Sequence, residues 1–234
     1  MNRIRWLSAQ WPTSIRTIGN RLKGMPFAED SINGFAIERI RDEFVIGRFI
    51  EKLVYEEVIS DPFGNEDTIE RTMYRSTEFT LFSIFPHIEI RNGQRSAKDL
   101  INQLLQACDF NLTVSPISSN LLEWADALQN IVGSKVMVDS LQVSGVELEH
   151  GITGKILLKG ERDVRDAVRG IVGIKRYTLE KIQVKLDFGG RALCLHLGNA
   201  GTAKLPLDCN EELLALLRQS FSHGRANLSH IPRL

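Results

Sequence analysis

Apolar and polar residues alternate in strand-like fashion through residues 34–90. Four stretches have an apolar residue at every second position, and polar breaks separate them at residues 41–43, at residues 60–67 and at Pro86. The middle break contains Asp-Pro and Gly-Asn, which are strong turn formers. This pattern predicts an antiparallel meander. At residues 49–58 the Glu and Lys content keeps a helical alternative open, although the alternation favours a strand.

Two amphipathic helices are predicted next. A Ser-x-x-Asp sequence at residues 96–99 resembles a capping box and opens a helix. Its apolar face consists of Leu100, Ile101, Leu104, Leu105 and Cys108. Asn120 opens a second helix, which Gly133 ends, and residues 110–114 alternate as a short strand between the two.

The second half of the chain starts again with strands, predicted at residues 136–138, 141–148 and 152–158. A short helix follows from Val164 and ends near Gly173. The clearest hairpin of the chain comes next, because residues 182–188 and 193–197 alternate with the same apolar parity around Gly189-Gly190. Residues 198–207 then read as a loop. A box-like cap at residues 208–211 opens a final Leu-rich helix.

These elements predict an α+β fold made of two stacked, mostly antiparallel sheet-plus-helix units, at residues 25–133 and 134–221. Both units contain a strand, a Gly-containing loop and a Leu-rich helix, at residues 87–108 and 193–221, which suggests a pseudo-repeat. The alternative is that this arrangement is simply common in α+β proteins. Residues 222–234 are expected to form a flexible tail.

The first 24 residues are basic. They carry a charge of +5 with no acidic residue before Glu29, while the whole chain has a net charge of zero. Apolar residues at steps of three and four predict an amphipathic helix, which Pro12 restricts to a start near that residue. This helix either packs on the body or forms a basic amphipathic arm that binds a partner. The predicted partner-binding residues are Arg3, Arg5, Trp6, Trp11, Arg16, Arg21 and Lys23.

The composition is that of an ordinary globular protein, with 43% hydrophobic and 25% charged residues among 234. Three cysteines without a CxxC pair argue against a disulfide framework and favour a cytoplasmic location. The apolar runs are far shorter than the roughly 20 residues that a membrane-spanning helix needs. No membrane span is therefore expected.

No motif for catalysis, metal binding or cofactor binding is evident, and none of these is predicted. The five histidines lack metal-ligand spacing. Cys194 and His196 share a strand face and are a conceivable thiol–imidazole pair, but no Asn or Asp partner is evident. The alternative is a half-buried thiol beside a surface imidazole.

A second basic region runs from Lys155 to Arg191, which contains ten Lys and Arg residues and five acidic residues. It predicts a surface for a nucleic-acid backbone. Its candidate residues are Arg162, Arg165, Arg169, Lys175, Arg176, Lys181 and Lys185. Because Asp163 and Asp166 interleave the arginines, a solvated face with local ion pairs is the alternative.

The function expected from these observations is that of a non-enzymatic subunit or adaptor of a larger cytoplasmic protein assembly, acting through protein–protein contacts. A nucleic-acid-binding protein that uses the basic arm and the surface at residues 162–191 is the alternative. An enzyme whose active site is assembled without a sequence motif is a third possibility.

Overall fold

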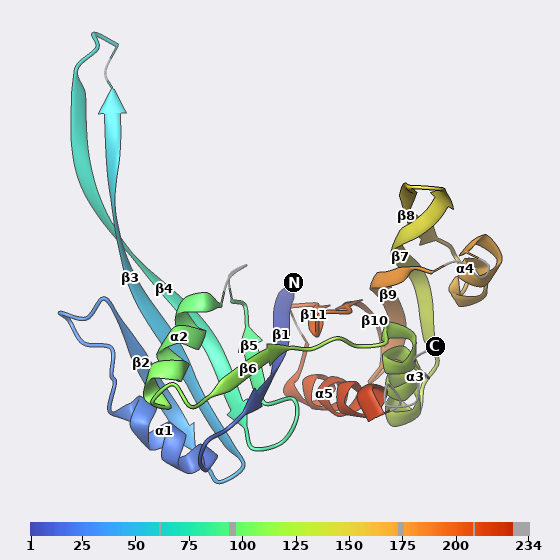
Figure 1. Cartoon of the computed structure of the whole chain (residues 1–234), viewed down its shortest axis with the longest axis horizontal. Coiled ribbons are helices and arrows are strands. Elements are labelled where there is room, and N and C mark those ends of the chain that lie inside the picture. Colours follow the sequence, from blue (N-terminus) through green and yellow to red (C-terminus); the bar gives the residue numbers. More distant parts are fainter. Residues whose placement is uncertain (61, 94–96, 173–175, 208, 227–234) are drawn as a thin grey trace. The chain divides into compact units, whose positions relative to one another are not determined.

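The computed structural model describes residues 1–60, 62–93, 97–172, 176–207 and 209–226, and of residues 169, 172 and 223–226 it describes the backbone alone. The described part of the chain contains five helices and eleven strands, which are labelled in Figure 1. The strands are hydrogen-bonded in one antiparallel series, β2-β3-β4-β5-β1-β11-β10-β9-β7-β8, and β6 pairs with β1. The predicted α+β class is confirmed, whereas the prediction of two stacked sheets is wrong. Local patterns located most strands but carried no information on how distant strands pair.

The chain divides into two compact units, which are described separately. Met1–Ser8 and Ser115–Leu234 form the split unit, and Ala9–Val114 forms the inserted unit. The predicted division into α+β units at residues 25–133 and 134–221 stays a prediction.

The inserted unit contains the predicted meander. Its strands are β2 (Asn33–Ile40), β3 (Phe44–Ser60), β4 (Glu66–Phe82) and β5 (Ile88–Arg91). Each pairs antiparallel with the next, and the stretch at residues 49–58 is a strand, as predicted. The β3–β4 hairpin is unusually long, because its pairing runs without a break from Phe44 opposite Phe82 to Ser60 opposite Glu66.

Helices α1 (Ile15–Lys23) and α2 (Lys98–Ala107) belong to the same unit, and α1 packs on β2 and β3. A Cβ atom on Gly19 would lie 2.7 Å from Val45 Cγ2, so α1 approaches the sheet closely only because this residue is glycine. In the same unit, the centroid of the Phe35 ring lies 5.3 Å from that of Phe49 and 5.8 Å from that of Phe79. The predicted capping box of α2 includes Ser96, which lies outside the described residues.

The predicted N-terminal arm is wrong. Residues Asn2–Gln10 form strand β1, and the helix that follows starts only at Ile15, where Ser14 is the N-cap. Ile4 and Trp6 are buried, which is the alternation of a strand, so the helical spacing of Ile4, Leu7 and Trp11 was coincidental. The helix predicted to start near Pro12 is confirmed as α1, whose buried face contains Ile15, Ile18 and Leu22. The predicted end of this helix at Gly24 is confirmed.

The split unit contains six main strands in the order β1-β11-β10-β9-β7-β8. Their bounds beyond β1 are β7 (Val136–Glu149), β8 (Ile152–Lys159), β9 (Thr178–Phe188), β10 (Arg191–Gly198) and β11 (Thr202–Leu205), with β6 at Thr113–Pro116. The predicted β9–β10 hairpin is confirmed, and its two-residue Gly189-Gly190 turn has φ angles of 60° and 74°. The predicted loop at residues 198–207 is wrong, because it contains β11, which pairs with both β1 and β10.

Helices α3 (Leu121–Val132) and α5 (Glu211–Ala226) run along one side of these strands, and α4 (Arg165–Val172) contacts β7 (Figure 1). The core between helices and sheet contains the rings of Trp6, Trp124 and Phe221, whose centroids lie 4.6–5.7 Å apart. Asn120 and Gly133 cap α3 at its two ends, as predicted. The predicted tail begins inside α5, and residues 227–234 lie outside the described part.

Candidate functional site

The outer part of the β3–β4 hairpin is the most distinctive surface of the inserted unit. We call residues 52–60 and 66–74 the ribbon. Figure 1 shows these two strands extending well beyond α1 and α2. Pairing along the ribbon starts with Lys52 opposite Tyr74 and is regular to the tip.

One face of the ribbon continues the core face of the inserted unit. Directly paired residues in an antiparallel hairpin share a face, and the face repeats every second residue. The buried residues Phe49 and Phe79 are therefore on the same side as a set of apolar residues further out. These are Leu53, Tyr55, Ile59, Ile69 and Met73. The last four are 44–47% exposed, so the apolar face extends past the helices that cover its inner part.

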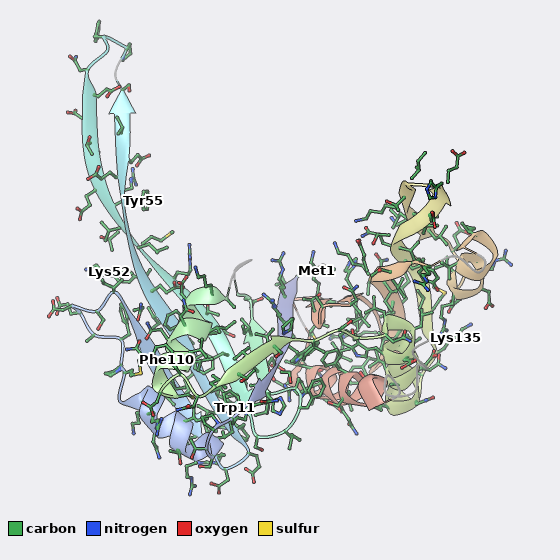
Figure 2. All side chains as sticks on the ribbon, in the orientation of Figure 1. Met1, Trp11, Lys52, Tyr55, Phe110 and Lys135 are labelled. Atoms are coloured by element: carbon green, nitrogen blue, oxygen red, sulfur yellow. The ribbon has the colours of Figure 1, made fainter. Side chains whose placement is uncertain are left out.

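Figure 2 shows Tyr55 on the part of β3 that projects from the body. On the same face, Arg71 forms an ion pair with Glu57. The opposite face carries the exposed Val54 and Val58. It also carries Glu56, Glu66 and Glu70. Residues 52–74 contain two basic and six acidic residues, so the segment has a net charge of −4.

This geometry is suited to binding a protein. A two-stranded ribbon in water is marginally stable by itself. Exposed apolar side chains that cluster on one element are typical of interaction sites, whereas scattered ones are ordinary. The ribbon is two-stranded, clusters such side chains on one face and carries a net negative charge.

Trp6, one of the seven predicted partner-binding residues, is wholly buried in the core of the split unit. Arg3 and Arg5 extend from the same strand to its polar face. The other four residues lie in the inserted unit.

These four residues hold the inserted unit together or lie on its surface. Trp11 donates its indole N–H to the Phe82 carbonyl oxygen at 2.8 Å. Arg16 pairs with Asp42, and Arg21 donates to the Ala107 carbonyl oxygen at 3.0 Å and to a carboxylate oxygen of Asp109 at 2.7 Å. Lys23 is exposed. The seven residues are therefore divided between the two units, and their part in partner binding stays a prediction.

The residues of the predicted nucleic-acid surface fall into two groups, those in ion pairs and those that are exposed. Arg165 donates to both carboxylate oxygens of Asp163 and pairs with Asp126. Burial raises the pKa of Asp163 and the hydrogen bonds from Arg165 lower it, with a net shift below its ordinary value. Lys185 Nζ lies 2.9 Å from Asp139 Oδ2. The expected local ion pairs therefore occupy Arg165 and Lys185.

Three other members of this set are exposed, namely Arg162, Arg176 and Lys181. Lys175 lies outside the described residues, and of Arg169 only the backbone is described. Strand register brings Lys181 to the same face of the sheet as Arg5, with β11 and β10 between them. Sequence reasoning placed these two residues in separate sites. It also missed Lys204 of the same face, because β11 read as a loop, and it considered His196 only as a partner of Cys194.

Cys194 and His196 do share a face of β10, as predicted. Burial, followed by the nearby Asp139 carboxylate, raises the pKa of the Cys194 thiol. A raised thiol pKa disfavours the thiolate that nucleophilic chemistry requires. Within the described part of the chain, no three His, Cys, Asp or Glu side chains are arranged to hold a metal ion.

A pocket of about 410 Å³ opens at the start of α3, lined by residues that include Ser119, Asn120, Tyr177 and Asn199. Two of its polar side chains, Ser119 and Asn120, already have partners. The Asn120 side chain accepts hydrogen bonds from the first turn of α3, and Ser119 donates to the Asn199 carbonyl oxygen. The pocket is therefore explained by the capping of α3.

No protein-family model matches the chain, and no curated protein matches it significantly. Among the helices that are described, none combines the length and apolar composition needed to cross a membrane.

Proposed function

We propose that this chain is a binding subunit of a protein assembly and that the ribbon is its docking element. The observation that carries the proposal is the continuation of the core face along the ribbon, where Tyr55, Ile59, Ile69 and Met73 remain 44–47% exposed. Burial of such side chains by a partner is favourable by about 25 cal/mol per Å² of apolar surface.

The partner is a protein with an apolar groove bordered by basic side chains. The apolar groove would cover the face that carries Tyr55 and Ile69. The basic border would complement the net charge of −4 on residues 52–74. A second copy of the ribbon fits less well, because two acidic ribbons repel each other.

The test compares two double variants of the full chain. Tyr55→Thr/Ile69→Thr removes apolar surface from the core-continuing face, and Val54→Thr/Val58→Thr removes it from the opposite face. Threonine keeps β-propensity, so both variants preserve the hairpin. The protein captured by the tagged wild-type chain is identified by mass spectrometry, produced in pure form and titrated by calorimetry.

We expect the first variant to weaken binding at least tenfold, about 1.4 kcal/mol, and the second to stay within about threefold of wild type. Equal effects of both variants, or no stoichiometric partner that binds in purified form, would contradict the proposal.

A further inference from the structure

The split unit carries a basic surface on the side of its sheet that is opposite the helices. We call it the basic face. Four adjacent strands contribute to it, namely β1, β11, β10 and β9. Its residues are Arg3, Arg5, Lys204, His196, Lys181 and Gln183.

Strand register arranges these residues in two rows. In the first row, Arg3 lies opposite Lys204, Lys204 opposite His196, and His196 opposite Gln183. The second row, two residues along each strand, contains Arg5 and Lys181, with Thr202 and Gly198 between them. Adjacent strands are about 4.8 Å apart, so each row spans about 14 Å.

Like charges are juxtaposed in the first row. Arg3 and Lys204 are directly opposite each other on neighbouring strands, a placement that destabilises a sheet. His196 lies opposite the same lysine, and burial together with the Lys204 and Lys181 ammonium groups lowers its pKa. A fold that accumulates positive charge at this point gains stability when an anion binds there.

Carboxylates of the described residues do not neutralise the centre of the basic face. Arg5, Lys181 and Lys204 form no ion pair within the part of the chain that the structure describes. Asp139 contacts Lys185 and Gln183 through Oδ2, and Glu180, which pairs with Lys155, lies on the opposite side of the sheet. The Asp139 carboxylate acts on His196 against the two lysines, but Arg5, Lys181 and Lys204 keep the centre of the face positively charged.

We infer that the basic face binds the phosphodiester backbone of a nucleic acid. A protein partner is disfavoured, because protein interfaces rely on apolar and aromatic anchors at their centre and both rows consist of polar residues and glycine. Backbone binding requires cations and hydrogen-bond donors, which arginine, lysine, glutamine and threonine side chains supply. A span of about 14 Å corresponds to about four base-pair steps along the axis of a duplex.

The mode of binding follows from the same residues. The rows contain no phenylalanine, tyrosine or tryptophan, and stacking on such rings is what favours single strands. We therefore expect sequence-independent binding in which a duplex binds at least as tightly as a single strand. This inference concerns a different surface from the ribbon, so the two proposals succeed or fail independently.

The test uses fluorescence anisotropy with the full-length protein and a labelled 20-base-pair duplex between 50 and 200 mM NaCl. The variant Arg5→Gln/Lys181→Gln/Lys204→Gln removes three charges from the basic face. The control Lys23→Gln/Arg162→Gln/Arg176→Gln removes three exposed charges elsewhere. A single strand of 20 nucleotides and polyglutamate are the competing probes.

We expect a dissociation constant in the micromolar range at low salt for wild type and control. The basic-face variant should bind at least tenfold more weakly, and the slope of log K against log salt should fall by about 2.7, three contacts at about 0.9 each. Three results would overturn the inference: no duplex binding by the wild type, loss of binding in the control variant instead, or equally tight binding of polyglutamate.

Discussion

His196 is the residue that reports most directly on the basic face. Burial and the like charges of Lys204 and Lys181 lower its pKa, while Asp139 opposes this shift. Lys204→Gln removes one of those like charges, so the pKa of His196 should rise towards its ordinary value. Nuclear magnetic resonance titration of the imidazole signals measures this change. If the midpoint is the same in wild type and variant, the two side chains are not neighbours across β10 and β11.

Glu180 connects stability to pH at the opposite side of the same sheet. Hydrogen bonds from Lys155, Ser144 and Gln142 lower its pKa to about 2. Because the folded pKa lies below the unfolded value near 4.5, the stabilisation is complete above that value and is lost as the pH falls towards 2. Glu180→Gln should therefore lower the melting temperature most at pH 7, with a difference from wild type that shrinks below pH 4.5. The exposed Glu161→Gln is the control, and a difference independent of pH would contradict the expectation.

At the scale of elements, the ribbon should be separable from the folding of the inserted unit. Its residues beyond Leu53 are mostly exposed, whereas the core around Phe49 and Phe79 lies before it. Replacing residues 53–73 by Asn-Gly joins the paired residues Lys52 and Tyr74 through a two-residue turn. Calorimetry should still show cooperative unfolding, while partner binding is lost. If the shortened protein is unfolded instead, the ribbon is required for the core of the inserted unit, and the prediction is wrong.

Phe49→Ala is the comparison for this deletion, because Phe49 is fully buried at the root of the hairpin. It should cost about 3–5 kcal/mol of unfolding free energy.

The β9–β10 hairpin should contribute strongly to stability. Leu195 and Val184 lie opposite each other and are completely buried. Leu195→Ala should cost about 2–5 kcal/mol, a large part of a total stability of about 5–15 kcal/mol. Denaturant titration should show a much lower midpoint with little change in the dependence of the unfolding free energy on denaturant. The control Leu157→Ala, at an exposed position of β8, should have little effect. A near-silent Leu195→Ala would mean that this pair lies outside the core.

Sequence patterns were sufficient for the elements whose pairing is local. The β2–β5 meander, the β9–β10 hairpin and the capped helix α3 all have turn or capping residues next to their apolar periodicity. The patterns failed for β1 and β11. In β1, apolar residues at Ile4 and Leu7 mimicked a helix, and β11 is only four residues long between Gly201 and Pro206. Each of the two strands pairs with the other, which is far away in the sequence, so no local turn signals the pairing.

At the scale of the whole molecule, the same two strands explain why the candidate sites could not be assembled from sequence. Arg5 pairs in register with Thr202, almost two hundred residues away, and no local pattern indicates such a contact. Arg5 and Lys181 were both recognised as candidates, but their common face depends on this pairing and on the pairing of β10 with β11 and β9. The apolar face of the ribbon could be predicted from the alternation of the sequence. Its exposure could not, because it depends on where the covering helices end.

The pairing of β1 with β11 also makes the first residues essential for folding, contrary to the behaviour of a dispensable arm. β1 contributes Trp6 to the aromatic core with Trp124 and Phe221, and its backbone pairs with β11 from Asn2 to Arg5. Removing residues 1–8 should therefore abolish the near-ultraviolet circular dichroism of this cluster and the cooperative unfolding of the split unit. Trp6→Ala, which keeps the strand, should cost about 3–5 kcal/mol and leave a cooperative transition at lower temperature. A truncated chain with the spectrum and melting temperature of the wild type would contradict this prediction, since β11 would then be stable without the strand that pairs with it.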